Sequence, residues 1–331
     1  MSEFFLELFS EEIPVNLQKN AREELLQNFK VFFEKENIIF SGKSLSFSTP
    51  NRLLILFSKI KKEVVQKEEE IRGPNINAPE KALEGFLRSN NIVKEEIFTK
   101  NIDRGEFYFY KKLEKKINTI DLLEENIPQI LNKISWKKSM KWGDFDLNWG
   151  RPLKSILAIF DNKTLQFNYH HLISSNSTYI DKEFEDKKKI FKNYNSYKNY
   201  FKKSGTIIDQ NLRKQFIERK LQLNAKKKNL VLEIDNKLLD TVSDLVEKPN
   251  ILVCKFDSKF LNMPKEILIT TMKHHQKYFH TFDNKGNITN QFLVVSNNRD
   301  AKSFIKSGNE SVVEARLSDA QFFGKKINHK I

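Results

Sequence analysis

The apolar residues of this chain occur in short runs whose spacing changes repeatedly between that of a buried strand and that of an amphipathic helix. Residues 4–9 form a short, largely apolar run that is typical of a buried strand. A helix is predicted next, because Pro14 suits a first turn and apolar residues then recur every three or four positions, at Leu17, Ala21, Leu25, Phe29 and Phe32. No internal repeat is visible. The sequence therefore predicts an α+β fold, multi-lobed, with mixed sheets and packed helices.

The same patterns predict the remaining elements. Strands are expected at residues 45–48, 53–60, 107–113, 165–171, 251–256, 278–282 and 292–296, of which 251–256 is apolar enough to be central. Helices are expected at residues 123–134, with Pro128 in the first turn, and at 238–246 and 264–273. A turn at 283–286, extended by 287–291, would join a β-hairpin. The highly charged residues 61–70 are expected to be a solvated arm or a helix edge, residues 72–75 a loop, and residues 136–152 a structured loop with a short strand.

Length and composition fit two domains, or three small ones, better than one. The chain has 331 residues, of which 39% are hydrophobic and 30% charged, so a sizeable core can form. The composition shifts near residues 175–205, which are rich in Lys, Asn, Ser and Tyr. We predict an N-terminal α+β domain over residues 1–160 and a second α+β domain over 161–300, with a Lys-rich insertion near 175–230. Residues 301–331 are predicted to start a following helical domain.

The chain is strongly basic, with a formal net charge of +14. Residues 181–230 hold 15 Lys and Arg against 6 Asp and Glu, a local charge of +9 that supplies most of the excess. Such a concentration favours a polyanionic partner such as nucleic acid. The alternative is a merely solvated surface, because 47 of the 57 basic residues are Lys and Asn occurs 33 times, a bias that an A/T-rich coding sequence would produce whatever the function.

Cysteine content and apolar run length bear on the compartment. A single cysteine, Cys254, excludes an intramolecular disulfide framework and suits a reducing cytoplasm. No apolar run reaches the roughly 18–20 residues needed to cross a bilayer, and the first residues lack the basic start and apolar stretch of a secretory signal. We therefore expect a cytoplasmic protein without a membrane contact.

Catalytic motifs are incomplete in this sequence. Residues 40–44 end in Gly-Lys-Ser, but position 37 is Asn where a phosphate-binding loop needs Gly. His274, His275 and His280 have no Cys or carboxylate at a useful offset for a metal site. Cys254 lies in an apolar run and is expected to be a buried, inert thiol. We predict no catalytic, cofactor-binding or metal-binding residue on this chain.

Several sequence clusters are informative together. Phe5-Leu6-Glu7-Leu8 and Glu11-Glu12-Ile13-Pro14 open the chain, and the later clusters are Thr49-Pro50-Asn51-Arg52-Leu53, Arg72-Gly73-Pro74, Met140-Lys141-Trp142-Gly143, Arg151-Pro152, Thr271-Met272-Lys273-His274-His275-Gln276-Lys277-Tyr278-Phe279, Val295-Ser296-Asn297-Asn298, Gly308-Asn309-Glu310 and Ala315-Arg316-Leu317-Ser318-Asp319-Ala320-Gln321-Phe322-Phe323. In this order and spacing they resemble the β subunit of the bacterial tetrameric glycyl-tRNA synthetase. The resemblance covers essentially the whole chain and corresponds to the N-terminal half of that subunit.

The resemblance implies an α2β2 class II synthetase that attaches glycine to tRNA(Gly) with ATP. In that family the α subunit forms the adenylate, so ATP and Mg are expected there and no cofactor on this chain, while the β subunit handles tRNA. The family also implies that the middle part resembles the editing-like module of other synthetases, without implying that it edits here.

Three features depart from the family pattern. A Gly-His-Arg-Phe element is replaced by residues 178–184, Ser311 stands where a basic residue is common, and a further helical domain and an anticodon-binding domain would lie beyond residue 331. The chain is expected to be either a fragment or a shortened subunit with impaired tRNA selection.

Ten residues are candidates for RNA contact. Lys can neutralise phosphate, His, Gln and Asn can bond phosphate or 2′-hydroxyls, and the planar Arg side chain suits phosphate. The candidates are Arg52, Arg72, Lys273, His275, Gln276, Lys277, Asn298, Arg299, Asn309 and Arg316. Tyr278 could add a stacking face. The alternative is structural: Gln276 and His275 would tie a helix end to the next strand, with Tyr278 and Phe279 in the core, and Arg316 could pair with Asp319.

Two other functions stay open at this point. The chain could be a stand-alone RNA-binding module derived from the β subunit, which would stay monomeric beside an α subunit. It could also be a hydrolase of mischarged tRNA, suggested only by the editing-like fold analogy. No nucleophile and base at a suitable spacing support the hydrolase.

Overall fold

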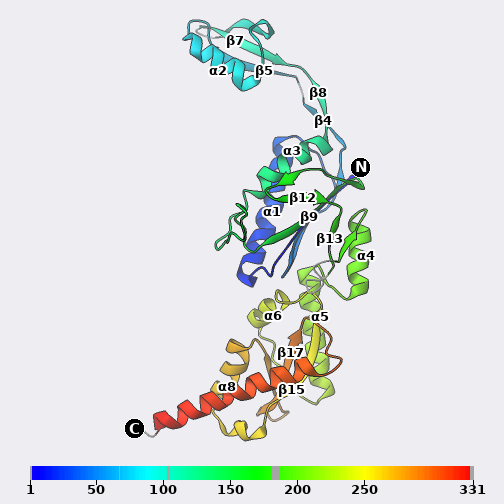
Figure 1. Cartoon of the computed structure of the whole chain (residues 1–331), viewed down its shortest axis with the longest axis vertical. Coiled ribbons are helices and arrows are strands. Elements are labelled where there is room, and N and C mark those ends of the chain that lie inside the picture. Colours follow the sequence, from blue (N-terminus) through cyan, green and yellow to red (C-terminus); the bar gives the residue numbers. More distant parts are fainter. Residues whose placement is uncertain (1, 67, 103–104, 181–186, 329–331) are drawn as a thin grey trace.

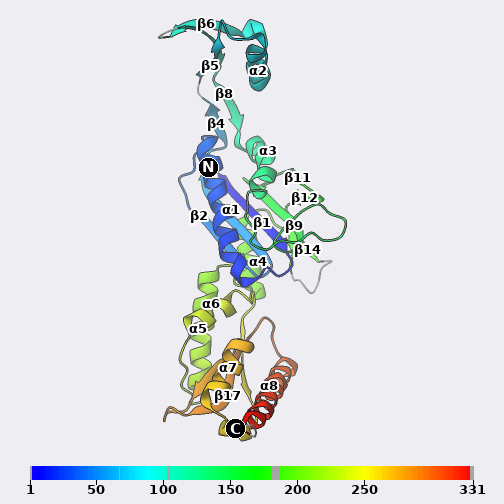
Figure 2. The same cartoon turned by 90° about the vertical axis from the view of Figure 1, so that its left-hand side faces the viewer.

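The computed structural model describes residues 2–66, 68–102, 105–180 and 187–328, arranged as three lobes in a line (Figures 1 and 2). The central lobe comprises residues 2–62, 119–180 and 187–209. An outer lobe, residues 69–102 and 105–112, stands on a two-stranded stalk at one end, and a distal lobe, residues 210–328, lies at the other. The predicted α+β class with several lobes is confirmed.

The central lobe is built on a seven-stranded sheet. Its order is β11-β12-β9-β1-β3-β2, with β10 paired to β9. The strands are β1 (Ser2–Ser10), β2 (Ser44–Thr49), β3 (Arg52–Ile60), β9 (Leu153–Phe160), β10 (Lys163–Thr164), β11 (Asn168–Tyr169) and β12 (Leu172–Ser175). β1 pairs antiparallel with β3 on one side and β9 on the other, which explains its nearly continuous apolar sequence.

Helices cover both faces of this sheet. Phe4, Leu6 and Leu8 of β1 pack on the side of α1 (Val15–Lys35) and α3 (Thr119–Leu131). Phe5 faces the other side, where α4 (Tyr194–Ser204) contributes the buried Tyr197 and Phe201. The predicted apolar stripe of α1 is buried as expected. Burying each such Leu or Phe side chain contributes roughly 1.5–3 kcal/mol, so these layers hold the lobe together.

The stretch predicted as a solvated arm and a loop instead forms strands. β4 (Glu63–Gln66) and β8 (Lys115–Asn118) pair to make the stalk. The outer lobe has a three-stranded sheet of β5 (Glu69–Asn75), β7 (Gly105–Lys112) and β6 (Ile97–Ile102), with α2 (Glu80–Asn90) and the short 3-10 turn Lys94–Glu96. The prediction is therefore wrong for residues 63–66 and 69–75, which form strands. A ladder of backbone hydrogen bonds needs no apolar side chains, so charged residues can form it.

The distal lobe is a three-stranded sheet between two helical layers (Figure 2). The sheet order is β15 (Asn250–Lys255), β17 (Ile288–Ser296), β16 (Phe279–Phe282). One face packs on α5 (Gln210–Lys227) and α6 (Asn236–Ser243). The other packs on the 3-10 turn Ser258–Asn262, α7 (Lys265–Thr270), the π-helical turn Thr271–His275 and α8 (Phe304–Asn328).

The short strands β13 (Ser177–Tyr179) and β14 (Lys188–Ile190) pair with each other in the central lobe.

Two details of the predicted elements need correction, while the hairpin of β16 and β17 is confirmed. The strand β15 lies at the edge of its sheet and β17 at the centre. Pro128 lies near the end of α3 and not in its first turn, because the helix already begins at Thr119. The domain limits stay predictions, although the described part of residues 175–205 packs on the central sheet through α4.

The thiol of Cys254 is expected to react slowly. It is 1% exposed in the distal core, and burial raises its pKa to about 12. Raising the pKa from an ordinary value of 9.0 to about 12 lowers the thiolate fraction at pH 8 on the order of 1000-fold. Reaction with a colorimetric disulfide reagent should therefore be slower by that order in the folded protein than in urea. Equal rates would contradict this burial, and the single cysteine makes the readout unambiguous.

Candidate nucleic-acid interface

A basic groove of about 580 Å³ runs along α5 where the distal lobe meets the central lobe. One wall is a stripe of α5, formed by Phe216, Lys220, Asn224 and Lys227 at helical spacing. The other wall comes from the start of β15 and the segment after β17. Together with the end of α4, this second wall contributes the lining residues Ser204, Gly205, Lys248, Pro249, Asn250, Ile251, Asn297, Asn298 and Arg299.

The groove is uniformly positive. Lys220, Lys227, Lys248 and Arg299 line it, and none of the described residues that line it is Asp or Glu. The Lys220 Nζ lies 5.6 Å from the centroid of the Phe216 ring, a cation–π contact that leaves the ammonium able to bond an anion. Four asparagines add amide donors between these cations. Cations interspersed with neutral donors suit a phosphate backbone.

Asn297 fixes one wall of the basic groove. Its Oδ1 accepts hydrogen bonds from the backbone N–H groups of Glu247 and Lys248, at 2.7 and 3.0 Å. Ser296 Oγ bonds the backbone of Asn298 in the same segment. The backbone that carries Lys248 is thereby tied to the end of β17, where Arg299 follows. These bonds preorganise cations from two distant segments.

Arg52, one of the candidates for RNA contact, is a buried member of an ion network. Its side chain is fully buried in β3, so it cannot contact RNA in this conformation. Its Nη1 donates to Glu7 Oε2 at 3.0 Å, its Nη2 donates to the Tyr179 carbonyl at 2.7 Å, and its Nε lies 3.4 Å from Glu247 Oε1. Burial alone lowers the pKa of Arg52, but Glu7, Tyr197 and Glu247 together more than offset this effect, so the pKa is raised and the guanidinium stays charged.

The same network joins the lobes. Glu7 also accepts hydrogen bonds from the hydroxyls of Thr178 and Tyr197, and Glu247 accepts one from Thr49. Burial, with Glu7 adding to it, holds the pKa of Tyr197 well above its ordinary value, so its hydroxyl remains a donor. Glu247 thus connects the central sheet to the wall of the basic groove. Of the family-divergent residues 178–184, Thr178 and Tyr179 serve this network, whereas 181–184 lie outside the described residues.

A second buried arginine closes the junction between the lobes. Arg213 of α5 is fully buried and donates to the carbonyls of Ser243, Ile207 and Ser48, at 2.6, 2.7 and 2.9 Å. Burial lowers its pKa, and the nearby Asp244 partly offsets that effect. The Ser48 bond crosses from α5 to β2. The basic groove is therefore held against the central lobe by satisfied, buried polar contacts.

The sequence motif at residues 271–279 does not reach the basic groove. Lys273 pairs with Asp235, which caps α6, and Lys277 Nζ donates to the His274 carbonyl at 2.9 Å. His275 is exposed, and Gln276 is half-buried after the π-helical turn. Neither is among the residues that line the groove. The motif therefore forms a separate surface.

Tyr278, the expected stacking residue, belongs to the core. It is 8% exposed and stacks on Phe292, with ring centroids 5.3 Å apart. Its hydroxyl donates to Asn309, whose amide donates to the Ile305 carbonyl, so Asn309 serves the packing of α8. The structural alternative therefore describes Tyr278 and Asn309. Arg316 is exposed on α8.

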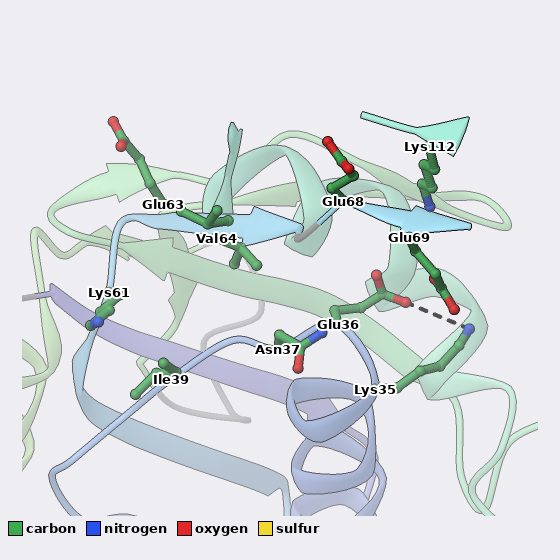
Figure 3. A pocket seen from close by; sticks show the side chains of 11 residues that line it. Lys35, Glu36, Asn37, Ile39, Lys61, Glu63, Val64, Glu68, Glu69 and Lys112 are labelled. Atoms are coloured by element: carbon green, nitrogen blue, oxygen red, sulfur yellow. Dashed lines mark ion pairs between the residues drawn. The ribbon is translucent and has the colours of Figure 1, made fainter. Parts of the chain in front are cut away.

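Arg72 lies on the outer lobe, away from the basic groove. It is exposed on β5, and its guanidinium carbon lies 3.7 Å from the centroid of the Phe107 ring. At the base of this lobe a pocket of about 680 Å³ is lined by α1, β4, β5 and the end of β7 (Figure 3). Its charges are mixed: Lys35 pairs with Glu36 at 3.5 Å, and Glu69 and Lys112 add both signs. A polyanion has no preference for such a surface.

In the described part of the chain, no three His, Cys, Asp or Glu side chains are grouped so that they could hold a metal ion. Nor does any described helix combine the length and apolar character needed to span a bilayer.

Sequence reasoning found two residues of the basic groove and missed the others. Asn298 and Arg299 were predicted individually, and both line it. Lys220, Lys227 and Lys248 were not named. Two signals could have identified Lys220 and Lys227. One is the local excess of positive charge over residues 181–230, and the other is the spacing of four and three residues along one face of α5.

Comparisons with known proteins agree on one family. A sequence model described as "Glycyl-tRNA synthetase beta subunit" matches residues 4–329. The chain is 42% identical over 328 residues to the glycine--tRNA ligase beta subunit of Rickettsia felis, covering 98% of this chain and 49% of that protein. The corresponding protein of Rickettsia akari is 40% identical over 326 residues, with the same coverage. The chain spans about half the length of the curated relatives it matches. On these matches, the chain belongs to the family of glycyl-tRNA synthetase beta subunits.

Proposed function

We propose that this chain is the tRNA-handling part of a glycyl-tRNA synthetase and that its basic groove binds the tRNA(Gly) backbone. The observation that carries the RNA contact is the groove itself, with four cations and no carboxylate among its described lining residues. Membership of the beta-subunit family supports the link to glycylation. Lysine and arginine would neutralise phosphates, and the asparagine amides would bond phosphate oxygens or 2′-hydroxyls.

In this proposal the chain does not activate glycine. An alpha subunit would bind ATP and Mg and form the adenylate, and the two kinds of subunit would assemble as a cytoplasmic α2β2 heterotetramer. The family description names a beta subunit, which supports the existence of such a partner. The chain would contribute positioning of the tRNA to the ATP-dependent attachment of glycine.

Binding of tRNA(Gly) to this chain should weaken steeply as salt rises. Four neutralised phosphates predict a log–log slope of about −3.6 if the contacted RNA is duplex and about −2.8 if it is single-stranded. Fluorescence anisotropy of labelled tRNA(Gly) between 50 and 300 mM KCl measures the slope. A slope near zero would remove the phosphate-binding role of the groove.

A further inference from the structure

An apolar chamber of about 630 Å³ continues the basic groove toward the central lobe. The two spaces share Gly205 and Phe216 in their linings. The chamber lies between β2, α4 and the first turns of α5, and its apolar walls include Leu45, Phe47, Tyr194, Ile207, Ile208 and Leu212. Gly205 has a φ of 83° where α4 ends, a left-handed conformation that lets the chain turn between the two spaces.

One face of α5 forms a wall along the whole length of both spaces. Leu212, Phe216, Lys220, Asn224 and Lys227 follow one another at spacings of four, four, four and three. The first two line the chamber and the last three line the basic groove, with Phe216 common to both. A single elongated ligand can therefore contact apolar side chains at one end and cations at the other.

The chamber offers aromatic surface under a cationic rim. The rings of Phe47 and Tyr194 are stacked, with an interplanar angle of 6° and centroids 6.3 Å apart. Lys198 and Lys202 of α4 also line the chamber. Its carboxylate, Asp209, is occupied as the N-cap of α5, where it accepts hydrogen bonds from the Asn211 and Leu212 N–H groups at 2.8 and 3.2 Å. The surroundings of the apolar walls are thus positive.

We propose that this chamber receives an unstacked base of the RNA whose phosphates lie along the basic groove. The inference rests on the proposed function and adds that the contacted RNA is single-stranded at this point. Apolar and aromatic walls bind the face of any base, while flanking cations bind the phosphates on either side of it. The chamber presents few polar groups, so it stacks a base without reading its identity. An apolar protein segment would not account for the six lysines and arginines along the two spaces.

The test compares two RNA hairpins that share one stem, one blunt and one with a 3′ overhang of four nucleotides carrying 2-aminopurine. The proteins are the wild-type chain, Leu212→Ser and the control Leu223→Ser. Leu212 and Leu223 are 56% and 45% exposed on the same helix, and only Leu212 lines the chamber. Wild type and control should bind the overhang RNA about tenfold more tightly than the blunt RNA, since stacking one base supplies that order of affinity. Their binding should also change the 2-aminopurine fluorescence.

Leu212→Ser should lose most of this preference and of the fluorescence change, while its affinity for the blunt hairpin stays within twofold of wild type. Equal affinity of the wild-type chain for both hairpins would overturn the proposal. So would an undiminished overhang preference in Leu212→Ser, or a loss of alpha-subunit binding in that variant with the overhang preference intact. Failure of both RNAs to bind in a salt-dependent manner would instead contradict the proposed function of the basic groove.

Discussion

Replacing Arg52 with methionine is expected to lower the free energy of unfolding by about 3–5 kcal/mol. The guanidinium is fully buried between Glu7 and Glu247 and donates to the Tyr179 carbonyl. Methionine preserves much of the side-chain volume but removes the positive charge, so two carboxylates lose their counter-ion in a region without water access. The loss is large because an uncompensated buried charge costs more than a missing contact.

Urea unfolding followed by tryptophan fluorescence measures this effect, because all three tryptophans lie in the central lobe with Arg52. The control Arg72→Met removes an exposed arginine of the outer lobe and should change the same transition by no more than about 0.5 kcal/mol. Adding Glu7→Gln to Arg52→Met should recover part of the loss, since it removes one unpaired charge. A loss below about 1 kcal/mol for Arg52→Met would show that the network does not stabilise the lobe.

Arg52 also illustrates what the sequence could and could not predict. Its position after a Pro turn resembled that of a loop arginine, and its partners lie 45 and 195 positions away in the chain. Glu7 stands inside an apolar run, which is a local hint of a paired buried charge, but the identity of the partner is a property of the folded sheet. Local periodicity predicts elements because it reflects which face of an element is buried; it contains no information on which charges meet.

The stalk and outer lobe show the same limit. The elements with apolar faces, such as α1 and β3, were predicted from spacing alone. β4 and β5 were missed because β4 has only four residues in a highly charged stretch and β5 contains charged residues and a Gly-Pro pair, while pairing with β8 and β7 supplies their hydrogen bonds. Pairing between positions 32 to 55 residues apart overrides the local preference of such segments.

The basic groove was predictable only in outline. The charge excess over residues 181–230 indicated α5, the family motif 295–298 included Asn298, and Arg299 directly follows that motif. Asn297 joins the segment that carries Arg299 to the segment that carries Lys248, because its side chain binds the backbone of residues 247 and 248, up to 50 positions away in the sequence. Four segments build the groove, so no single stretch of sequence contains its pattern.

Removing three cations of the basic groove together should have the second large effect, this time on binding. The triple variant Lys220→Gln, Lys227→Gln and Arg299→Gln is expected to reduce the magnitude of the salt slope for tRNA(Gly) by about 3. If the wild-type chain and the triple variant bind tRNA(Gly) equally at 1 M salt, this difference in slope gives an affinity loss on the order of 100-fold near 0.15 M.

The control removes the same charge from exposed positions on α5 and at its C-cap that do not line the groove, as Arg219→Gln, Lys226→Gln and Lys228→Gln. If only the total charge of the distal lobe mattered, both triple variants would lose the same slope. A contact formed inside the groove predicts instead that the control keeps its slope to within about 1, because charges pointing to solvent release few counterions on binding. Equal losses would therefore assign RNA binding to the charge of the distal lobe as a whole. A loss confined to the groove variant would show that phosphates occupy the space between α5 and Arg299.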